Sequence, residues 1–270
     1  MALRPFQDEQ LNYFKFASIV LNEFPKALRH TFKSTWGKTF KHLLPWNDSS
    51  LVRKLFRNTE GSTTKVPTDI SYEEWDCTVL FQVTIYARSF ALPDSKGHLK
   101  TLSDLYVNPH KLTYGKFHVS VISSRGDDAE TFALAIDQLR LLRNTLSHST
   151  SSEIVKATFD QYVQLAKDAF KALGVMTGPI DVIGGLAAAD FPIEKVRKLE
   201  ETRKEETLAY INFLQSNSES IEEIKGVLTK MKEDMANKED IAMLTQKLND
   251  RREVPAQEKP VKTNSVVTHV

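Results

Sequence analysis

The sequence predicts an all-α protein in which a helical bundle is followed by a coiled-coil helical arm. Through the first 175 residues, apolar side chains recur at three- and four-residue steps, the spacing of a helix with one buried face. Two residue pairs carry helix-capping signals. From residue 193 the composition changes to Glu, Lys and Arg with a heptad repeat of apolar residues. We therefore expect a helical domain at 1–175, a Gly- and Pro-containing linker at 176–192, a coiled-coil arm at 193–250 and a disordered tail at 251–270.

Charge and cysteine content exclude several classes of protein. The 36 Lys and Arg residues balance 35 Asp and Glu, for a net charge of +1, so no bulk basic field implies DNA or an anionic membrane. Any nucleic-acid site must be local. The single cysteine, Cys77, can form neither an internal disulfide nor a zinc-ligand cluster, which excludes a zinc finger or RING within this chain and fits a reducing compartment.

Targeting and membrane signals are missing from the sequence pattern. Lys15, Asn22 and Glu23 interrupt the apolar residues near the N-terminus, so these residues lack the h-region of a signal peptide. No later segment approaches the roughly 20 apolar residues needed to span a bilayer. We expect a cytoplasmic protein, with the nucleus as the alternative, and no membrane partner.

The N-terminal third of the sequence predicts helices and leaves two alternatives open. Apolar residues from Leu11 to about Phe40 follow a helical spacing that Pro25 interrupts, which indicates two helices or one kinked helix. The segment SYEEWDCTVLFQVTIYARSF favours a buried helix, although its β-branched residues also permit a strand. Residues 91–126 contain several Gly and Pro residues and predict a long ordered loop or an inserted turn of helix.

Residues 127–174 predict two consecutive helices. Asp127 and Glu130 form a capping-box pair ahead of a stripe comprising Phe132, Ala135, Ile136, Leu139, Leu142 and Leu146. Thr150 and Glu153 form a second such pair, so we expect the next helix to begin there and to end at Gly174. Its expected inward positions are Ile154, Thr158, Tyr162, Leu165, Ala169 and Leu173.

The charged C-terminal segment carries the heptad pattern. Its seam alternates three- and four-residue steps, which is narrower than one face of a globular core, through Ile221, Ile224, Leu228, Met231 and Met235. Ile241, Leu244 and Leu248 repeat the pattern after a break. We expect this arm to bring two copies of the chain together.

The segment RNTLSH, residues 143–148, could carry chemistry. The Arg143 guanidinium can hold a phosphate through two hydrogen bonds, and His148 can move a proton near neutral pH. Asn144 could orient either group, and Arg140, one turn earlier, could extend the anion-binding surface. This set suits cleavage of RNA, where the ribose 2′-hydroxyl is the nucleophile and no metal or other cofactor is needed.

A structural role for the same residues remains open. A histidine in the last turn of a helix is favoured by the helix dipole, and an arginine there can bond the terminal carbonyls. Arg143 and His148 are five residues apart, about 140° around an ideal helix. They would converge only if the last turn distorts or a second copy of the chain contributes.

A long apolar helix ending in RNTLSH, followed by a second helix, resembles the HEPN superfamily, whose motif is Arg, four to six residues, then His. Residues from about Asn12 to Leu173, including NYFKFASIVL, WDCTVLF and LRLLRNTLSHST, look like the HEPN domain of the DAZ-interacting zinc-finger-protein type. The resemblance implies a helical bundle that dimerises around the motif, with Arg143 and His148 as a ribonuclease pair and Asn144 as their polar neighbour. Many HEPN domains are instead non-catalytic RNA-binding or interaction modules.

Weaker signals indicate further partners. Lys33, Lys38 and Lys41 are interleaved with aromatic residues, as on a surface that binds single-stranded RNA, or as the solvated rim of an amphipathic helix. Thr268, His269 and Val270 fit a C-terminal peptide for a PDZ-type groove.

Two functions follow from the sequence. One is a dimeric RNA-binding protein and metal-independent endoribonuclease, which requires Arg143 and His148 to be accessible in a shared cleft. The other is a non-catalytic coiled-coil adaptor or scaffold, for example in innate immune signalling, which allows both residues to be buried or tied to helix ends.

Overall fold

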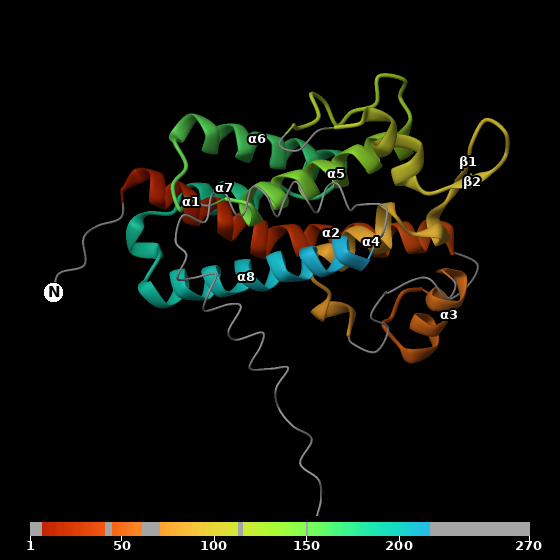
Figure 1. The fold of residues 1–270 in the computed structure, drawn as a ribbon, viewed down its shortest axis with the longest axis horizontal. Coiled ribbons are helices and arrows are strands. Elements are labelled where there is room, and N and C mark those ends of the chain that lie inside the picture. Colours follow the sequence, from red (N-terminus) through yellow and green to blue (C-terminus); the bar gives the residue numbers. More distant parts are fainter. Residues whose placement is uncertain (1–6, 41–44, 61–70, 113–115, 150, 217–270) are drawn as a thin grey trace, which may run out of the picture. The chain divides into compact units, whose positions relative to one another are not determined.

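The computed structural model describes residues 7–40, 45–60, 71–112, 116–149 and 151–216 (Figure 1). This part of the chain is 71% helical and 2% strand, which confirms the all-α prediction. These described residues all belong to one compact unit. No helix within it is long and apolar enough to cross a membrane.

The N-terminal segment is one helical run with a π turn in its middle. Helix α1 (Asp8–Ser18) continues through the π turn Ile19–Glu23 into α2 (Phe24–Thr39). Pro25 lacks a backbone N–H, and its ring would clash with the carbonyl of Leu21 in a regular α-helix. The wider spacing of a π turn just before the proline accommodates that ring, so the structure selects the continuous alternative.

Helix α4 resolves the choice between helix and strand. It spans Cys77–Ile85 after the 3₁₀ turn Tyr72–Glu74, and its N-cap residue Asp76 accepts a hydrogen bond from the Val79 amide at 2.8 Å. This cap favours a helical start despite the β-branched residues that follow. Helix α3 (Ser50–Glu60) lies beyond α2 along the chain.

An aromatic cluster holds this part of the bundle together. The Phe32 ring of α2 is fully buried, and it lies within 4.8 to 6.5 Å, centroid to centroid, of the rings of Trp36, Trp46, Phe56, Tyr72, Trp75 and Phe90. Aromatic pairs at these separations add stability beyond the burial of their area. The core therefore has an aromatic centre around Phe32.

Within the segment predicted at 91–126, the described residues include a short hairpin and two helical turns. Strands β1 (Leu92–Pro93) and β2 (Leu99–Lys100) form a short antiparallel hairpin. A π turn at Ser103–Val107 and a 3₁₀ turn at Asn108–His110 follow.

Helices α5 and α6 test the two capping predictions. Helix α5 (Asp128–Ser147) begins after Asp127, whose carboxylate accepts hydrogen bonds from the amides of Ala129 and Glu130, so the predicted helix start and the Asp127 cap are confirmed. The Glu130 carboxylate instead accepts hydrogen bonds from Ser123 and Arg125. Helix α6 (Lys156–Ala172) begins later than predicted. The Ile154 amide donates to the Glu9 carbonyl at 2.9 Å, which ties the preceding residues to α1 instead of to a helical turn.

The predicted end of α6 is correct. Gly174 follows the helix with a φ of +69°, the left-handed conformation in which glycine ends a helix. Thr150, half of the second predicted capping pair, lies outside the described residues.

The predicted linker and the start of the predicted arm are packed structure. Residues 176–192 contain α7 (Gly178–Gly184) and a 3₁₀ turn at Ala188–Asp190, and Ile180 and Phe191 are buried in the core. Helix α8 (Ile193–Ser216) packs against α1, α4 and α5 (Figure 1). The compact unit therefore does not end near residue 175, because α8 completes one side of the bundle. The heptad seam from Ile221 onward lies outside the described residues and stays a prediction.

Candidate functional site

The RNTLSH segment forms the last turns of α5, where α8 packs against it. Arg143 is only 1% exposed, although arginine is among the residues least often buried. It points into the contact between α5, α4 and α8. Its surroundings therefore decide what it can do.

The Arg143 guanidinium donates hydrogen bonds from all three of its nitrogens within the protein. Nε and Nη2 donate to Oε2 of Glu206 at 3.3 and 3.0 Å, and Nη2 also donates to the Glu206 carbonyl at 2.9 Å. Nη2 bonds the Thr78 hydroxyl as well, and Nη1 donates to the Asn144 side chain at 3.2 Å. The side chain is thus the centre of a buried ion pair between α5 and α8.

Glu206 is the anionic partner and has a second contact. Its Oε1 accepts a hydrogen bond from the Cys77 amide at 3.1 Å, in the first turn of α4. Burial raises the pKa of the Glu206 carboxyl above its ordinary value, although Arg143 acts in the opposite direction. The carboxylate therefore depends on Arg143 to stay charged in this position.

Tyr210, one turn after Glu206 on α8, contacts all three residues of the predicted catalytic set. The Arg143 guanidinium carbon lies 4.8 Å from the Tyr210 ring centroid, and the Asn144 amide donates to the Tyr210 hydroxyl at 3.1 Å. The His148 ring centroid lies 5.8 Å from that of Tyr210. One side chain of α8 thus covers Arg143, Asn144 and His148 together.

His148 lies where the helix distorts. It is the C-cap residue of α5, with φ −99° and ψ 2°, and its amide donates to the Asn144 carbonyl. From their spacing, His148 and Arg143 are expected to converge only if this last turn distorts or a second copy of the chain contributes. Both residues contact the same tyrosine of α8 within one chain.

Arg140 lies in a second buried network. Its Nε donates to Oδ1 of Asp137 at 2.6 Å, and Nε2 of His118 lies 2.7 Å from Oδ2 of the same carboxylate. Burial alone would raise the pKa of Asp137, but Arg140 and then His118 outweigh it and hold that pKa below its ordinary value. In the structure Arg140 is therefore an ion-pair partner within the bundle.

The lysine and aromatic segment is divided between surface and core. Lys33 lies over the Tyr72 ring at 4.9 Å and within 3.9 Å of the Glu73 carboxylate, and Lys38 is exposed near the end of α2. Trp36 is buried in the aromatic core, so it presents no face on which a base could stack. Lys41 and the C-terminal residues Thr268, His269 and Val270 lie outside the described residues.

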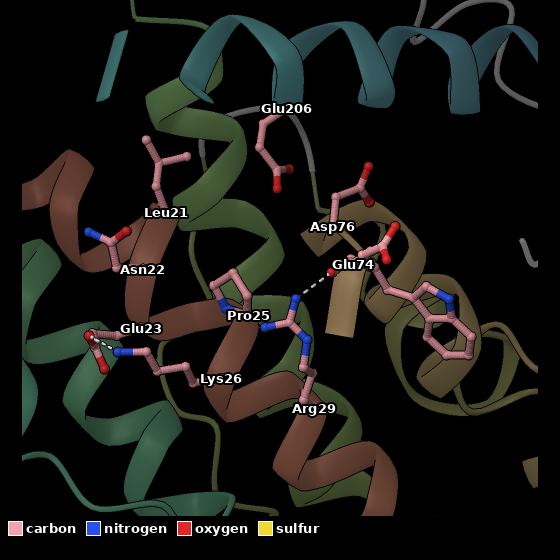
Figure 2. Close-up of a pocket in the computed structure, with 10 residues that line it drawn as sticks. Leu21, Asn22, Glu23, Pro25, Lys26, Arg29, Glu74, Asp76 and Glu206 are labelled. Carbon is pink, nitrogen blue, oxygen red and sulfur yellow. Dashed lines mark hydrogen bonds and ion pairs between the residues drawn. The ribbon is translucent and has the colours of Figure 1, made fainter. Parts of the chain in front are cut away.

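A hollow of about 520 Å³ lies beside the Arg143 site (Figure 2). The start of α2 and the residues before α4 form its sides, and Glu206 reaches it from α8. Its lining is mainly polar and comprises Leu21, Asn22, Glu23, Pro25, Lys26, Arg29, Glu74, Trp75, Asp76 and Glu206. In the described part of the chain, no group of three or more His, Cys, Asp or Glu side chains could hold a metal ion.

Sequence reasoning found Arg143, Asn144 and His148 but missed the residues that surround them. Glu206 and Tyr210 are four residues apart in a charged stretch that reads as a solvated helix, and Thr78 and Cys77 precede a buried apolar run. No spacing in the sequence connects these positions with Arg143.

Comparison with known proteins leaves the family open. No protein-family profile, curated protein or solved structure matches this chain.

Proposed function

We propose that this chain is a non-catalytic, HEPN-like assembly module whose C-terminal heptad segment brings copies together. The burial of Arg143 is the observation that supports this function. A ribonuclease arginine must face its substrate phosphate, whereas this guanidinium is 1% exposed and paired with Glu206. A structural role for Arg143 and His148, which the sequence left open, fits this buried geometry without any rearrangement.

The electrostatics of the site support the same proposal. A phosphate would have to enter a space already occupied by the Glu206 carboxylate, and two anions in such a site repel each other. Tyr210 also covers the face on which Asn144 and His148 would meet a substrate. Catalysis would therefore require α8 to move away from α5.

Cleavage of labelled single-stranded RNA in EDTA tests the non-catalytic role. The wild-type chain and an Arg143→Ala/His148→Ala variant, shown by circular dichroism to be folded, are incubated with RNAs of several sequences. We expect no cleavage by either protein. Cleavage by the wild type alone would establish a metal-independent endoribonuclease and refute the proposal.

Analytical ultracentrifugation tests the assembly role. An Ile224→Lys/Leu228→Lys variant places two charges in the predicted heptad seam, whereas the control Glu222→Lys/Glu223→Lys changes neighbouring positions outside it. We expect the wild type and the control to form dimers and the seam variant to be monomeric. A monomeric wild type, or a seam variant that still dimerises, would contradict a role for the arm in assembly.

A second candidate is RNA binding with metal-independent cleavage in a state where α8 has moved. The contacts of Tyr210 with Arg143, Asn144 and His148 favour it, because they place the three groups under one side chain. In that state Arg143 would hold the phosphate and His148 would transfer the proton. The RNA cleavage assay distinguishes this candidate from the assembly module.

A further inference from the structure

Helix α8 buries both polar and apolar side chains against the bundle. Among its described side chains, Leu199, Glu206 and Tyr210 are buried, Val196 packs against the core, and Arg203 donates to the Ser149 carbonyl at 2.9 Å. A buried ion pair is often no more stabilising than apolar side chains of the same size, because both charges lose their hydration. Polar contacts around Arg143 therefore form a substantial part of the contact that the structure describes for α8.

The core beneath α8 is formed largely by other helices. The buried aromatic cluster belongs to α2, α3 and the residues around α4, and α6 packs against both α1 and α5. Breaking the contacts of α8 would leave these interactions in place. Regions attached by few apolar contacts are those that open before the whole protein unfolds.

The Glu206 carboxylate accepts hydrogen bonds from donors that would also suit another anion. Arg143 donates to Oε2, and the Cys77 amide donates to Oε1. The amide belongs to the first turn of α4, where helix N–H groups have no partner inside the helix and carry partial positive charge. The Thr78 hydroxyl, bonded to Arg143, lies at the same place. An arginine and a helix N-terminus together are a common arrangement for binding phosphate.

The chain offers a pivot at the start of α8. Phe191 is buried, with its ring centroid 6.1 Å from that of Phe14, and Pro192 follows immediately before the helix. The anchored phenylalanine would hold the base of α8 in place while the rest of the helix moved. Glu206 also lines the hollow in Figure 2.

We propose that α8 is a displaceable cover and that the Glu206 carboxylate is the intramolecular occupant of an anion site formed by Arg143 and the Cys77 amide. Opening removes Tyr210 as well, so Arg143, Asn144 and His148 become accessible in one step. An external anion that binds only the open state competes with Glu206, and its apparent affinity falls with the fraction of chains that are open. This device goes beyond the proposed assembly role and does not depend on it.

Native-state hydrogen exchange on the full chain tests the cover. In the wild type we expect the Tyr210 amide of α8 to exchange through an opening of lower free energy and smaller denaturant dependence than the Leu139 amide of α5. Equal free energies and equal denaturant dependence would show one cooperative unit and overturn the proposal.

Two alanine variants in adjacent positions sharpen this test. Glu206→Ala removes the buried carboxylate, whereas Glu205→Ala changes an exposed residue of the same helix. We expect Glu206→Ala to speed exchange of the Tyr210 amide at least tenfold, about 1.4 kcal/mol, because the lost contacts exist only in the closed state. The Leu139 amide should accelerate to the same extent, since its opening starts from the same closed state. Glu205→Ala leaves both amides as in the wild type. No acceleration of the Tyr210 amide by Glu206→Ala would contradict a cover held in place by this carboxylate.

Rescue by inorganic phosphate tests the anion site. We expect phosphate to raise the thermal midpoint of the Glu206→Ala variant by about 2 °C or more, relative to chloride at equal ionic strength. The same addition has no such effect on Arg143→Met/Glu206→Ala, which lacks the guanidinium. Equal shifts in the two variants, or none in either, would refute an anion site at Arg143.

Discussion

Replacing Asp137 by asparagine tests the buried network that holds Arg140. The carboxylate is fully buried and accepts charge-assisted hydrogen bonds from Arg140 and His118 at 2.6 and 2.7 Å. Asparagine keeps the shape but removes the charge, and its amide group must face one of the two donors. Breaking a buried ion pair costs about 3 to 5 kcal/mol. We expect Asp137→Asn to lower the free energy of unfolding at pH 7 by about 3 kcal/mol, since one hydrogen bond to the amide oxygen is retained.

Urea unfolding followed by tryptophan fluorescence measures this loss, because Trp36, Trp46 and Trp75 are all buried in the bundle. Asp128→Asn, an exposed neighbour on α5, is the matched control and should change the free energy by less than about 0.5 kcal/mol. A loss below about 1 kcal/mol for Asp137→Asn would refute the ion-pair interpretation.

The pH dependence of the same variant gives a second check. The pKa of Asp137 is lower in the folded chain than its ordinary value of 3.8. Its contribution is therefore present in full above the unfolded pKa and is lost as the pH falls through the lower folded pKa. The difference between wild type and Asp137→Asn should be constant from pH 7 to pH 5 and shrink below about pH 4. A difference that grows in acid would contradict this sign.

Three further predictions concern the core, two glycines and a tyrosine. Phe32→Ala should lower the free energy of unfolding by about 3 to 5 kcal/mol in urea, because it empties the centre of the aromatic cluster. Gly37→Ala, within α2 and with open space around it, should raise that free energy by about 0.5 to 1 kcal/mol. Gly174→Ala, at φ +69°, should lower it by about 1 to 2 kcal/mol. A change of the same sign in both variants would contradict this reasoning. Burial and the Asp127 hydrogen bond raise the pKa of Tyr106 to about 12. Asp127→Ala should move that pKa toward 10, measured by carbon-13 NMR of the ring, and an unchanged value would contradict the assignment.

Local signals in the sequence predicted the parts of the fold that depend on local contacts. Asp127 caps α5 because its carboxylate reaches amides two and three residues later, which spacing alone reveals. Gly174 ends α6 for an equally local reason. The start of α6 could not be predicted in this way, because the deciding bond joins Ile154 to Glu9, far away in the sequence.

The same difference between local and long-range contacts explains which residues of the candidate site were predicted and which were missed. Arg143, Asn144 and His148 lie in one short motif, so their types and spacing were visible. Glu206 lies 63 residues from Arg143, on a helix whose charged composition indicates a solvated surface. Only the packing of α8 on α5 shows that one of its glutamates faces inward.

The central claim is that α8 closes the arginine and histidine motif in the folded chain. NMR exchange of the Arg143 side-chain Nε–H, assigned by its loss in Arg143→Lys, tests this most directly. We predict a signal that exchanges far more slowly than that of the exposed Arg197, and that exchanges rapidly in Glu206→Ala but not in Glu205→Ala. An Arg143 signal that exchanges as fast as that of Arg197 in the wild type would contradict the claim.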